Sequence, residues 1–343
     1  MSAVKGRQNS ILSNAQNEEE FSVEESIRPL WLSDYIGQQS IKDNLSVFIG
    51  AANKREEPLD HVLLYGSAGL GKTTLASIIA RETGREIRIT SGPAIERPID
   101  LIIILKALRE GDVLFIDEIH RLRKPIEEIL YSAMEDFAVD RVISRGIGAK
   151  PIRISLPKFT LIGATTRSGN LSSPLRARFG ILLALSFYTP EQLEKIVMRS
   201  ASILKVQITP KAAYELASRA RGTPRIANRL LRRVRDFAEV KNEGTITEEI
   251  ADYALSCLGI DKRGLDHEDR AILDLLTGKF KGRAVGLETL SASVSDEPEN
   301  IEEVYEPYLL KEGLIEKTTR GRMATAEAYM VLGKEIPKKL QNY

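Results

Sequence analysis

Residues 61–76, HVLLYGSAGLGKTTLA, decide the fold of this chain. They combine an apolar run typical of a buried strand, a loop bounded by glycines and the start of a helical pattern. The loop matches the pattern G-x-x-x-x-G-K-[ST], in which backbone N–H groups close around phosphate oxygens. A glycine-rich turn that merely reverses the chain is the alternative. The strand before the loop and the helix after it favour a phosphate-binding loop.

The loop residues have distinct expected roles at a nucleotide. Lys72 supplies positive charge to the β- and γ-phosphates, and Thr73 offers its hydroxyl to Mg²⁺. The nucleotide-binding residues expected from this loop are Gly69, Gly71, Lys72, Thr73 and Thr74. A nucleotide and Mg²⁺ are therefore the expected cofactors.

A second apolar run, DVLFIDEIH at residues 112–120, ends in two carboxylates. Continuous apolar runs are typical of buried parallel strands. Asp117 is expected to join the Mg²⁺ shell, and Glu118 to orient or deprotonate the attacking water. The alternative is that this acidic pair caps a helix beginning near Pro125 or lies on a solvated turn.

A third apolar run, FTLIGA at residues 159–164, leads into Thr165, Thr166 and Arg167. It places small hydroxyls at another strand end, where ligands of open parallel sheets bind. Further along, Arg176 and Arg178 precede an apolar segment. Either they are ordinary surface charge, or they include an arginine finger delivered to the γ-phosphate of a neighbouring subunit.

Arg225 lies in the first turn of a predicted helix that begins at Pro224, with Thr223 as the candidate N-cap. A cation is mildly disfavoured there by the helix dipole. This local cost points to a ligand anion near Arg225.

The composition limits compartment and partners. The chain has 343 residues, 43% of them hydrophobic, enough for two to three domains with real cores. A net charge of +1 means that any basic patch must be local. A single cysteine and three unclustered histidines exclude a disulfide framework and a zinc site. With no bilayer-length apolar run and no signal peptide, we expect a cytoplasmic protein without membrane contacts.

The chain is predicted to have an α/β nucleotide domain with a parallel sheet, a small helical lid and a winged helix. Within the nucleotide domain, alternating residues from 139 to 159 predict a hairpin that turns near Gly146. The predicted boundaries are 1–26 for a disordered tail, 27–187 for the nucleotide domain, 188–259 for a purely helical lid and 260–343 for the winged helix.

The winged helix is predicted from three short helices followed by two short strands around a basic turn. Lys317, Arg320 and Arg322 cluster on this turn, as phosphate contacts require. Such modules more often bind DNA, but protein-binding versions are common enough that both interpretations stay open.

With these motifs in place, the chain resembles the RuvB family of AAA+ ATPases, the bacterial motors of Holliday-junction branch migration. The resemblance runs from about Arg28 to the end of the wing. It rests on the runs RP at 28–29, DYIGQ at 34–38, GLGKTTLA at 69–76, DEIHRL at 117–122, EDF at 135–137, PLRARFG at 174–180, RGTPRIA at 221–227 and EPYL at 306–309.

The resemblance implies roles at the nucleotide. Thr166 senses the γ-phosphate, Arg178 is the finger acting in trans, and Arg225 is the lid sensor. The remaining nucleotide-binding residues that it implies are Ile27, Arg28, Glu135, Asp136, Phe137 and Tyr188.

The resemblance also implies partners. They are ATP, duplex DNA at four-way junctions, a homo-hexameric ring, RuvA docked on the hairpin 139–159, and the RuvC resolvase as a further partner. Lys317 and Arg322 would be the DNA contacts of the wing.

Several positions depart from the family pattern. The loop has Ser67-Ala68 in place of two prolines, and Ala177 replaces an acidic residue between the two arginines. Ile99 stands where glycine is usual and is expected to strain the backbone. Arg283-Ala284 replaces Gly-Pro, and Lys317 replaces an arginine. We expect these changes to affect rate and DNA affinity rather than identity.

Two other functions compete with a DNA-translocating ATPase. A protein-remodelling AAA+ ATPase needs an aromatic pore loop, and no such run occurs. A nucleotide-switched DNA-binding scaffold shares the layout of an ATPase domain and a winged helix, but would hydrolyse ATP slowly and without stimulation by junction DNA. ATP is expected rather than GTP, because no [NT]-K-x-D motif occurs.

Overall fold

The computed structural model describes residues 25–142 and 151–340. The chain divides into two compact units, one formed by Arg28–Ser186 and the other by Phe187–Tyr343 with the segment up to Ile27. Most of the predicted disordered tail and the predicted hairpin turn at Gly146 lie outside the described residues.

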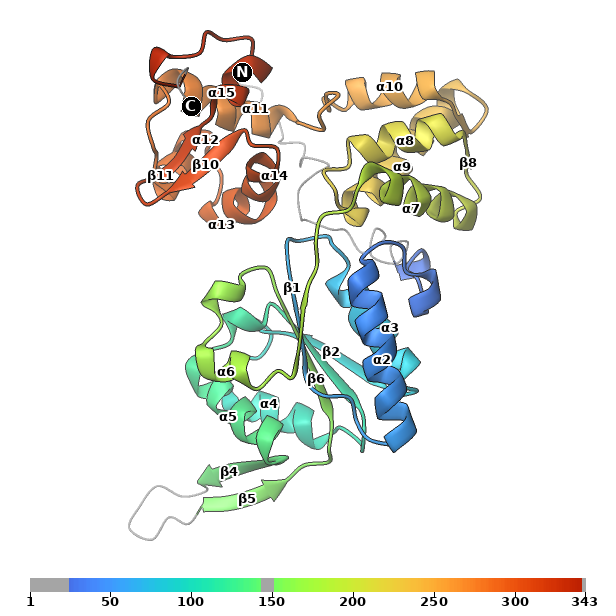
Figure 1. Cartoon of the computed structure of the whole chain (residues 1–343), viewed down its shortest axis with the longest axis vertical. Helices are drawn as coiled ribbons and strands as arrows, with labels where there is room; N and C mark the ends of the chain where they lie inside the picture. Colours follow the sequence, from blue (N-terminus) through green and yellow to red (C-terminus); the bar gives the residue numbers. More distant parts are fainter. Residues whose placement is uncertain (1–24, 143–150, 341–343) are drawn as a thin grey trace, which may run out of the picture. The chain divides into compact units, whose positions relative to one another are not determined.

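The unit Arg28–Ser186 is built on a parallel sheet with strand order β2-β3-β6-β1-β7. Figure 1 shows α2 and α3 on one face of this sheet and α4, α5 and α6 on the other. The strands are β1 (Val62–Tyr65), β2 (Ile87–Ser91), β3 (Val113–Asp117), β6 (Thr160–Thr165) and β7 (Ile181–Ala184). The helices are α2 (Gln39–Arg55), α3 (Lys72–Glu82), α4 (Pro98–Lys106), α5 (Lys124–Glu135) and α6 (Ser173–Ala177), with 3₁₀ turns at Leu32–Asp34, Ile119–Arg121 and Ser168–Asn170.

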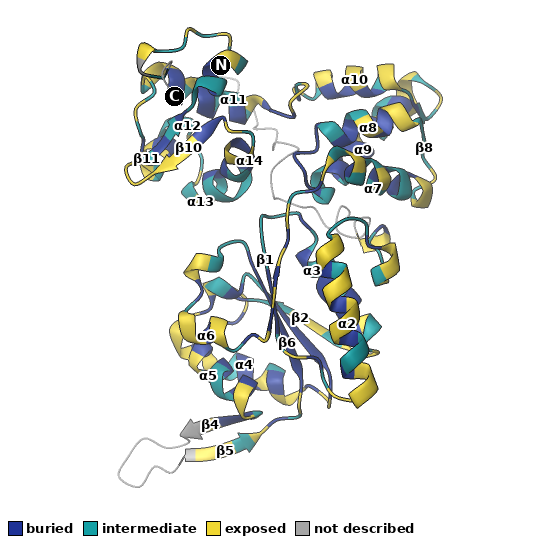
Figure 2. Ribbon diagram, viewed as in Figure 1, coloured by how far each residue is buried: buried dark blue, intermediate teal, exposed yellow. Residues whose placement is uncertain are grey.

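The three strands predicted from apolar runs form the centre of the sheet. β6 lies between β3 and β1, and its residues are buried throughout. Figure 2 shows the same burial along the central strands. Because each strand is covered by helices on both faces, its sequence reads as a continuous apolar run rather than an alternating one.

Ile99 does not strain the backbone, contrary to the expectation from the family pattern. It is the second residue of α4, has no positive φ, and packs against the apolar core of the domain. A helical residue needs no glycine, because the right-handed region is open to every side chain.

The hairpin predicted between 139 and 159 is present as the antiparallel pair β4 (Ala138–Val142) and β5 (Pro151–Ser155). It is shorter than the predicted range, because Leu156 and Phe159 belong to the buried core. In Figure 1 the pair extends away from the parallel sheet.

The lid is formed by α7 (Pro190–Ile203), α8 (Pro210–Ser218), α9 (Pro224–Lys241) and α10 (Glu248–Cys257). The prediction that this region is purely helical is wrong. The strands β8 (Gln207–Ile208) and β9 (Thr245–Ile246) pair in parallel between the helices. Two-residue strands are too short for an alternating pattern to reveal them.

The C-terminal region has the predicted winged-helix arrangement. Its helices are α11 (His267–Asp274), α12 (Leu287–Val294), α13 (Pro298–Asn300), α14 (Glu306–Lys311) and α15 (Ala326–Val331), with π-helical turns at Leu275–Lys279 and Ile301–Tyr305 and a 3₁₀ turn at Lys338–Leu340. The wing is the antiparallel pair β10 (Ile315–Thr318) and β11 (Gly321–Ala324). Residue Val285 forms a β-bridge with Arg322, which ties the preceding segment to the wing.

Within the two described ranges, no helix combines the length and the apolar character needed to span a bilayer.

Candidate functional site

The loop after β1 has the backbone geometry of a phosphate cradle. Gly66, Gly69 and Gly71 all have positive φ, at 144°, 78° and 96°. A Cβ at Gly66 would lie 2.5 Å from the carbonyl oxygen of Leu185, so no larger residue fits there. Gly71 is the N-cap of α3, and the free N–H groups of this helix start therefore point toward the loop.

Lys72 is folded over the loop that precedes it. Its Nζ donates to the carbonyl oxygens of Gly66, at 2.8 Å, and Ser67, at 3.0 Å, and the residue is 8% exposed. The ammonium group of Lys72 therefore places a positive charge beside the backbone N–H groups of the loop. The Ser67-Ala68 departure leaves the positive-φ glycines and Lys72 in place.

Asp117 and Glu118 end β3 and begin the turn after it. The carboxylate of Asp117 accepts from the backbone N–H of Glu118 at 2.9 Å, and Glu118 itself is left-handed, with φ 47° and ψ 43°. Arg121 donates to the Glu118 carboxylate at 3.2 Å. The N-cap of α5 is Arg123, so the alternative that the acidic pair caps this helix is wrong.

Thr165 ends β6 and Thr166 follows it, and the two threonines differ in their contacts. The Thr165 hydroxyl lies 3.0 Å from Nδ1 of His120 and accepts from the backbone N–H of Arg167 at 2.9 Å. The Thr166 hydroxyl is buried and has no hydrogen-bond partner within residues 25–142 and 151–340. Buried hydroxyls are normally paired, so the Thr166 hydroxyl has hydrogen-bonding capacity left over at this strand end.

His120 lies in the 3₁₀ turn after β3, and its ring contacts Thr165 at the end of β6. Burial is the main cause that lowers the pKa of its imidazole, with the nearby Glu118 opposing and Arg167 adding to the effect. The ring is therefore neutral at physiological pH, so its hydrogen bond to Thr165 brings no additional positive charge to this edge.

The three strand ends lie at one edge of the sheet, because β3, β6 and β1 are neighbours with parallel register. Tyr65 pairs with Thr165, and Ile116 pairs with Gly163. Asp117 is the last residue of β3, and Thr73 is the second residue of α3, which follows the loop after β1. A carboxylate and a hydroxyl residue therefore follow strands that end at this edge. Oxygen ligands of this kind suit Mg²⁺, which uses one or two carboxylates together with phosphate oxygens. The donor set fits the metal.

Arg178 is held in three ways. Its guanidinium donates to Glu135 at 3.0 Å and to the carbonyl oxygen of Pro174 at 2.8 Å, and its Cζ lies 4.5 Å from the ring centre of Tyr131. Arg176, by contrast, is exposed. The residue pattern by itself did not show whether Arg176 or Arg178 is the candidate finger. Of the two, Arg178 is the one whose side chain is held by these three contacts.

The three side chains of the EDF run at 135–137 make different contacts. Glu135 pairs with Arg178, whereas Asp136 pairs with Arg153 of β5 at 2.9 Å. Phe137 meets Phe159 edge to face, with ring centres 5.9 Å apart, and its backbone is left-handed, with φ 49°.

Three of the expected nucleotide-binding residues, Ile27, Tyr188 and Arg225, belong to the unit formed by Phe187–Tyr343 and the segment up to Ile27. Ile27 is 3% exposed, and its carbonyl oxygen accepts from Arg199 at 2.7 Å. Tyr188 is also buried, and its backbone N–H donates to the carbonyl oxygen of Gly222 at 2.9 Å. Arg225 lies half-buried in the first turn of α9. The hydroxyl of its N-cap residue, Thr223, donates back to Ala220 at 3.3 Å.

The basic residues of the wing differ sharply in exposure. Arg320 is exposed at the turn between β10 and β11. Lys317 pairs with Glu302 at 3.1 Å and with Glu306 at 3.3 Å. Arg322 is 8% exposed and donates to the buried carboxylate of Glu306 at 2.9 and 3.2 Å. Its charge is therefore already neutralised within the domain.

One buried cluster was not anticipated from the sequence. Arg221, with a side chain 2% exposed, donates to the carboxylate of Asp269 and to the carbonyl oxygen of Gly264. Burial raises the pKa of Asp269 well above its ordinary range. Arg221 has a left-handed backbone, with φ 54°, and was part of a run interpreted only as a turn and a helix start.

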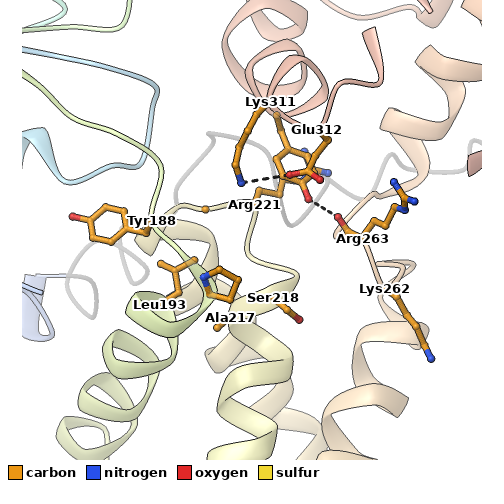
Figure 3. Close-up of a pocket in the computed structure, with 12 residues that line it drawn as sticks. Tyr188, Leu193, Ala217, Ser218, Arg221, Lys262, Arg263, Lys311 and Glu312 are labelled. Carbon is orange, nitrogen blue, oxygen red and sulfur yellow. Dashed lines mark hydrogen bonds and ion pairs between the residues drawn. The ribbon is translucent and has the colours of Figure 1, made fainter. Parts of the chain in front are cut away.

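Arg221 also lines a cavity of 320 Å³, shown in Figure 3. Lys311 and Glu312 form an ion pair of 3.4 Å at its edge, and the Arg263 carbonyl accepts from the Tyr308 hydroxyl. The cavity is lined by residues of α7, α8 and α14, by the segment joining α8 to α9, and by Lys262 and Arg263 between α10 and α11.

A five-stranded parallel sheet with a phosphate-binding loop after β1, a helical lid and a winged helix define a P-loop ATPase of the AAA+ class. Three family models match consecutive parts of the chain: the Holliday junction DNA helicase RuvB P-loop domain at 27–185, the RuvB AAA lid domain at 188–261, and the RuvB C-terminal winged helix domain at 262–333. The chain therefore belongs to the RuvB family.

Solved structures agree with the family models. A structure titled as the Thermotoga maritima RuvB Holliday junction branch migration motor is 49% identical, with a TM-score of 0.84, and the match covers 91% of this chain and 100% of that one. Two point mutants of Thermotoga maritima RuvB match at the same identity. Their TM-scores are 0.85 and 0.84, with coverage of 91% and 90% of this chain and 99% and 100% of theirs. This chain is accordingly a nucleotide-binding ATPase of the branch-migration type.

Proposed function

We propose that this chain forms a hexameric ring on duplex DNA and uses Mg²⁺-dependent ATP hydrolysis to drive branch migration at four-way junctions together with RuvA. The observation that carries the proposal is the meeting of three strand ends at one edge of the sheet. β1 leads to the phosphate cradle, β3 to Asp117 and Glu118, and β6 to the buried hydroxyl of Thr166.

The chemistry assigned to this edge is in-line attack of water on the γ-phosphate. The N-terminus of α3 and Lys72 bind the phosphates, while Thr73 and Asp117 would hold Mg²⁺. The metal, when bound, neutralises charge on the phosphate oxygens. Glu118 orients the water and accepts its proton, and Thr166 donates its hydroxyl to the γ-phosphate.

The remaining nucleotide contacts are part of the same proposal. Arg178 stabilises transition-state charge at the site of the neighbouring subunit, and Arg225 reports the nucleotide state through the lid. The other proposed nucleotide-binding residues are Ile27, Arg28, Gly69, Gly71, Thr74, Glu135, Asp136, Phe137 and Tyr188.

The proposed partners use the other elements. RuvA docks on the hairpin of β4 and β5, RuvC is a further partner, and the wing contacts DNA phosphates. Arg320 is supported as a phosphate contact by its exposure. Lys317 and Arg322 remain proposed contacts, and both have to exchange their glutamate partners for phosphate.

The division into four segments also remains a proposal. A tail at 1–26, a nucleotide domain at 27–187, a lid at 188–259 and a winged helix at 260–343 are supported by the similar limits of the matching family models.

ATPase measurements with and without four-way junction DNA and RuvA test the proposal. We expect stimulation by both, and no turnover for Lys72→Ala under any condition, with the fold retained. A slow rate unchanged by junction DNA would instead support a nucleotide-switched scaffold. Turnover by Lys72→Ala at the parent rate would refute the site.

A further inference from the structure

The ring of Tyr131 faces the guanidinium of Arg178. The Arg178 Cζ lies 4.5 Å from the ring centre, and the Arg178 side chain is 20% exposed. A cation over an aromatic face is attracted by the ring quadrupole, and this attraction occupies no N–H donor. Among the described residues, Nε of Arg178 is buried without a hydrogen-bond partner. The contact with Tyr131 therefore orients the guanidinium and leaves donor capacity free.

The other contacts of Arg178 are of a different kind. Glu135 pairs with it through a carboxylate that is 57% exposed, and exposed ion pairs are weak and easily exchanged. Pro174 belongs to the same short helix, α6, and accepts through its backbone carbonyl. Tyr131 and Glu135 both belong to a separate, longer helix, α5, and Tyr131 is the less exposed of the two.

Tyr131 is itself fixed by a buried carboxylate. Glu127, one turn earlier on α5, is 7% exposed and accepts from the Tyr131 hydroxyl at 3.1 Å. The same carboxylate oxygen accepts from the Ser172 hydroxyl at 2.7 Å. The bond from Tyr131 holds its phenol oxygen against the buried carboxylate, and the bond from Ser172 holds that carboxylate in place.

Ser172 links this network to the segment that carries the arginine. It is the N-cap of α6, where its oxygen accepts from the backbone N–H of Leu175 at 3.4 Å. Arg178 is the C-cap of the same helix. The Glu127 carboxylate therefore holds both the start of the arginine-bearing helix and the ring under the guanidinium.

We propose that Tyr131, fixed by Glu127 and Ser172, is a positioning residue for Arg178, and that its ring holds the guanidinium ready for the γ-phosphate of the neighbouring subunit. The proposal rests on the proposed role of Arg178 as a finger. It assigns to Tyr131 an effect on hydrolysis in the neighbouring site and none on nucleotide binding in its own.

The first test uses rings in which all subunits carry the same substitutions. It measures kcat with junction DNA and the Kd for ATP. Tyr131→Leu is expected to lower kcat at least tenfold while changing the Kd less than twofold, and to cause no further loss when added to Arg178→Ala. The matched control is Tyr214→Leu, which removes an exposed tyrosine on α8 and is expected to retain the parent kcat.

Two further variants separate the ring from the hydroxyl. Tyr131→Phe keeps the aromatic face and is expected to retain at least a third of kcat. Tyr131→Met has a similar volume but no aromatic face and is expected to behave like Tyr131→Leu. If Tyr131→Leu does not fold, this pair decides. A Phe variant as inactive as the Met variant would overturn the proposal.

Mixed rings locate the effect. Lys72→Ala subunits supply a finger, and Arg178→Ala subunits supply an intact site, so mixing them is expected to restore some hydrolysis. Adding Tyr131→Leu to the finger-donating subunit should lower the restored rate at least tenfold, whereas adding it to the site-supplying subunit should not. A merely structural role would lower the rate in both arrangements, and that result would overturn the proposal.

The outcomes separate this proposal from the one it rests on. If Arg178→Ala retained the parent kcat, the finger assignment itself would fail. If Arg178→Ala were inactive while Tyr131→Leu kept the parent kcat, the finger would stand and the role of Tyr131 would be refuted.

Discussion

Glu118 has a left-handed backbone, which few carboxylate residues adopt. Its φ is 47°, and such a conformation costs on the order of 1 kcal/mol in a residue with a Cβ. The conformation redirects the chain directly after Asp117, the last residue of β3, so that Glu118 does not continue the strand. The backbone N–H of Glu118 then turns back to the Asp117 carboxylate at 2.9 Å.

Glu118→Gln is expected to abolish hydrolysis and to preserve ATP binding. The amide keeps the size of the side chain but cannot accept the proton of the attacking water, so kcat should fall by roughly 10²- to 10⁴-fold. Single-turnover hydrolysis and equilibrium ATP binding measure the two effects separately. Glu128→Gln, an exposed position on α5, is the control and should match the parent. Loss of ATP affinity in Glu118→Gln would indicate that Glu118 contributes to binding instead.

At the scale of secondary-structure elements, the sequence predicted the elements that show a recognisable pattern over consecutive residues. The loop of residues 66–73 and the buried strands β1, β3 and β6 could be recognised, because a buried parallel strand is continuously apolar. The two-residue strands β8 and β9 could not be. The partners of Tyr131 and Arg322 could not be predicted either, because they are set by which helix packs beside which, not by spacing along the chain.

His61 shows how such a tertiary contact joins two elements. One ring nitrogen accepts from the backbone N–H of Leu161, at 2.9 Å, at the start of β6. The other nitrogen lies 3.1 Å from the carbonyl oxygen of Met134 on α5, to which it donates. This pattern requires a neutral ring, and burial lowers the pKa of His61.

The free energy of unfolding is therefore expected to depend on pH through His61. Below the ordinary imidazole pKa of about 6.5 the unfolded chain takes up a proton before the folded chain does, so stability falls as pH decreases toward the lowered folded pKa. His61→Gln should reduce this slope, as measured by denaturant unfolding between about pH 5 and 8. His267→Gln, at an exposed position, serves as the control and should leave the slope unchanged. An equal slope in both variants would contradict the assignment.

The wing gives a second prediction at the element scale, because Arg320 and Arg322 are two residues apart with opposite environments. Arg320→Ala should weaken DNA binding across sequences and reduce the salt slope by roughly one unit, without loss of stability. Arg322→Ala should lower the free energy of unfolding by about 3 kcal/mol. The buried Glu306 carboxylate then loses its guanidinium partner and keeps the ion pair with Lys317. Salt-dependent DNA titration and thermal unfolding distinguish the two. An unstable Arg320→Ala would contradict this division.

At the scale of the whole molecule, the lid and the winged helix are joined by the pair of Arg221 and Asp269. Arg221 lies between α8 and α9 of the lid, and Asp269 lies on α11 of the winged helix. A second carboxylate, Asp266, lies 3.5 Å from the same guanidinium. Two carboxylates and one arginine buried together form a link that depends on each member, because an uncompensated buried charge is costly.

Arg221→Met is expected to lower the free energy of unfolding by about 3 kcal/mol at neutral pH, because it leaves Asp266 and Asp269 buried without their cation. The loss should shrink as pH falls. Burial already raises the pKa of Asp269 well above its ordinary range, so the folded variant binds a proton at a pH where the unfolded chain does not, and acid then favours the fold. The measurement is denaturant unfolding from about pH 5 to 8. Arg263→Met removes an exposed arginine that pairs with Glu327 at 2.8 Å and should lose less than about 1 kcal/mol at every pH. A loss in Arg221→Met that is small, or that does not change with pH, would show that the lid and the winged helix are held together by apolar packing rather than by this buried pair.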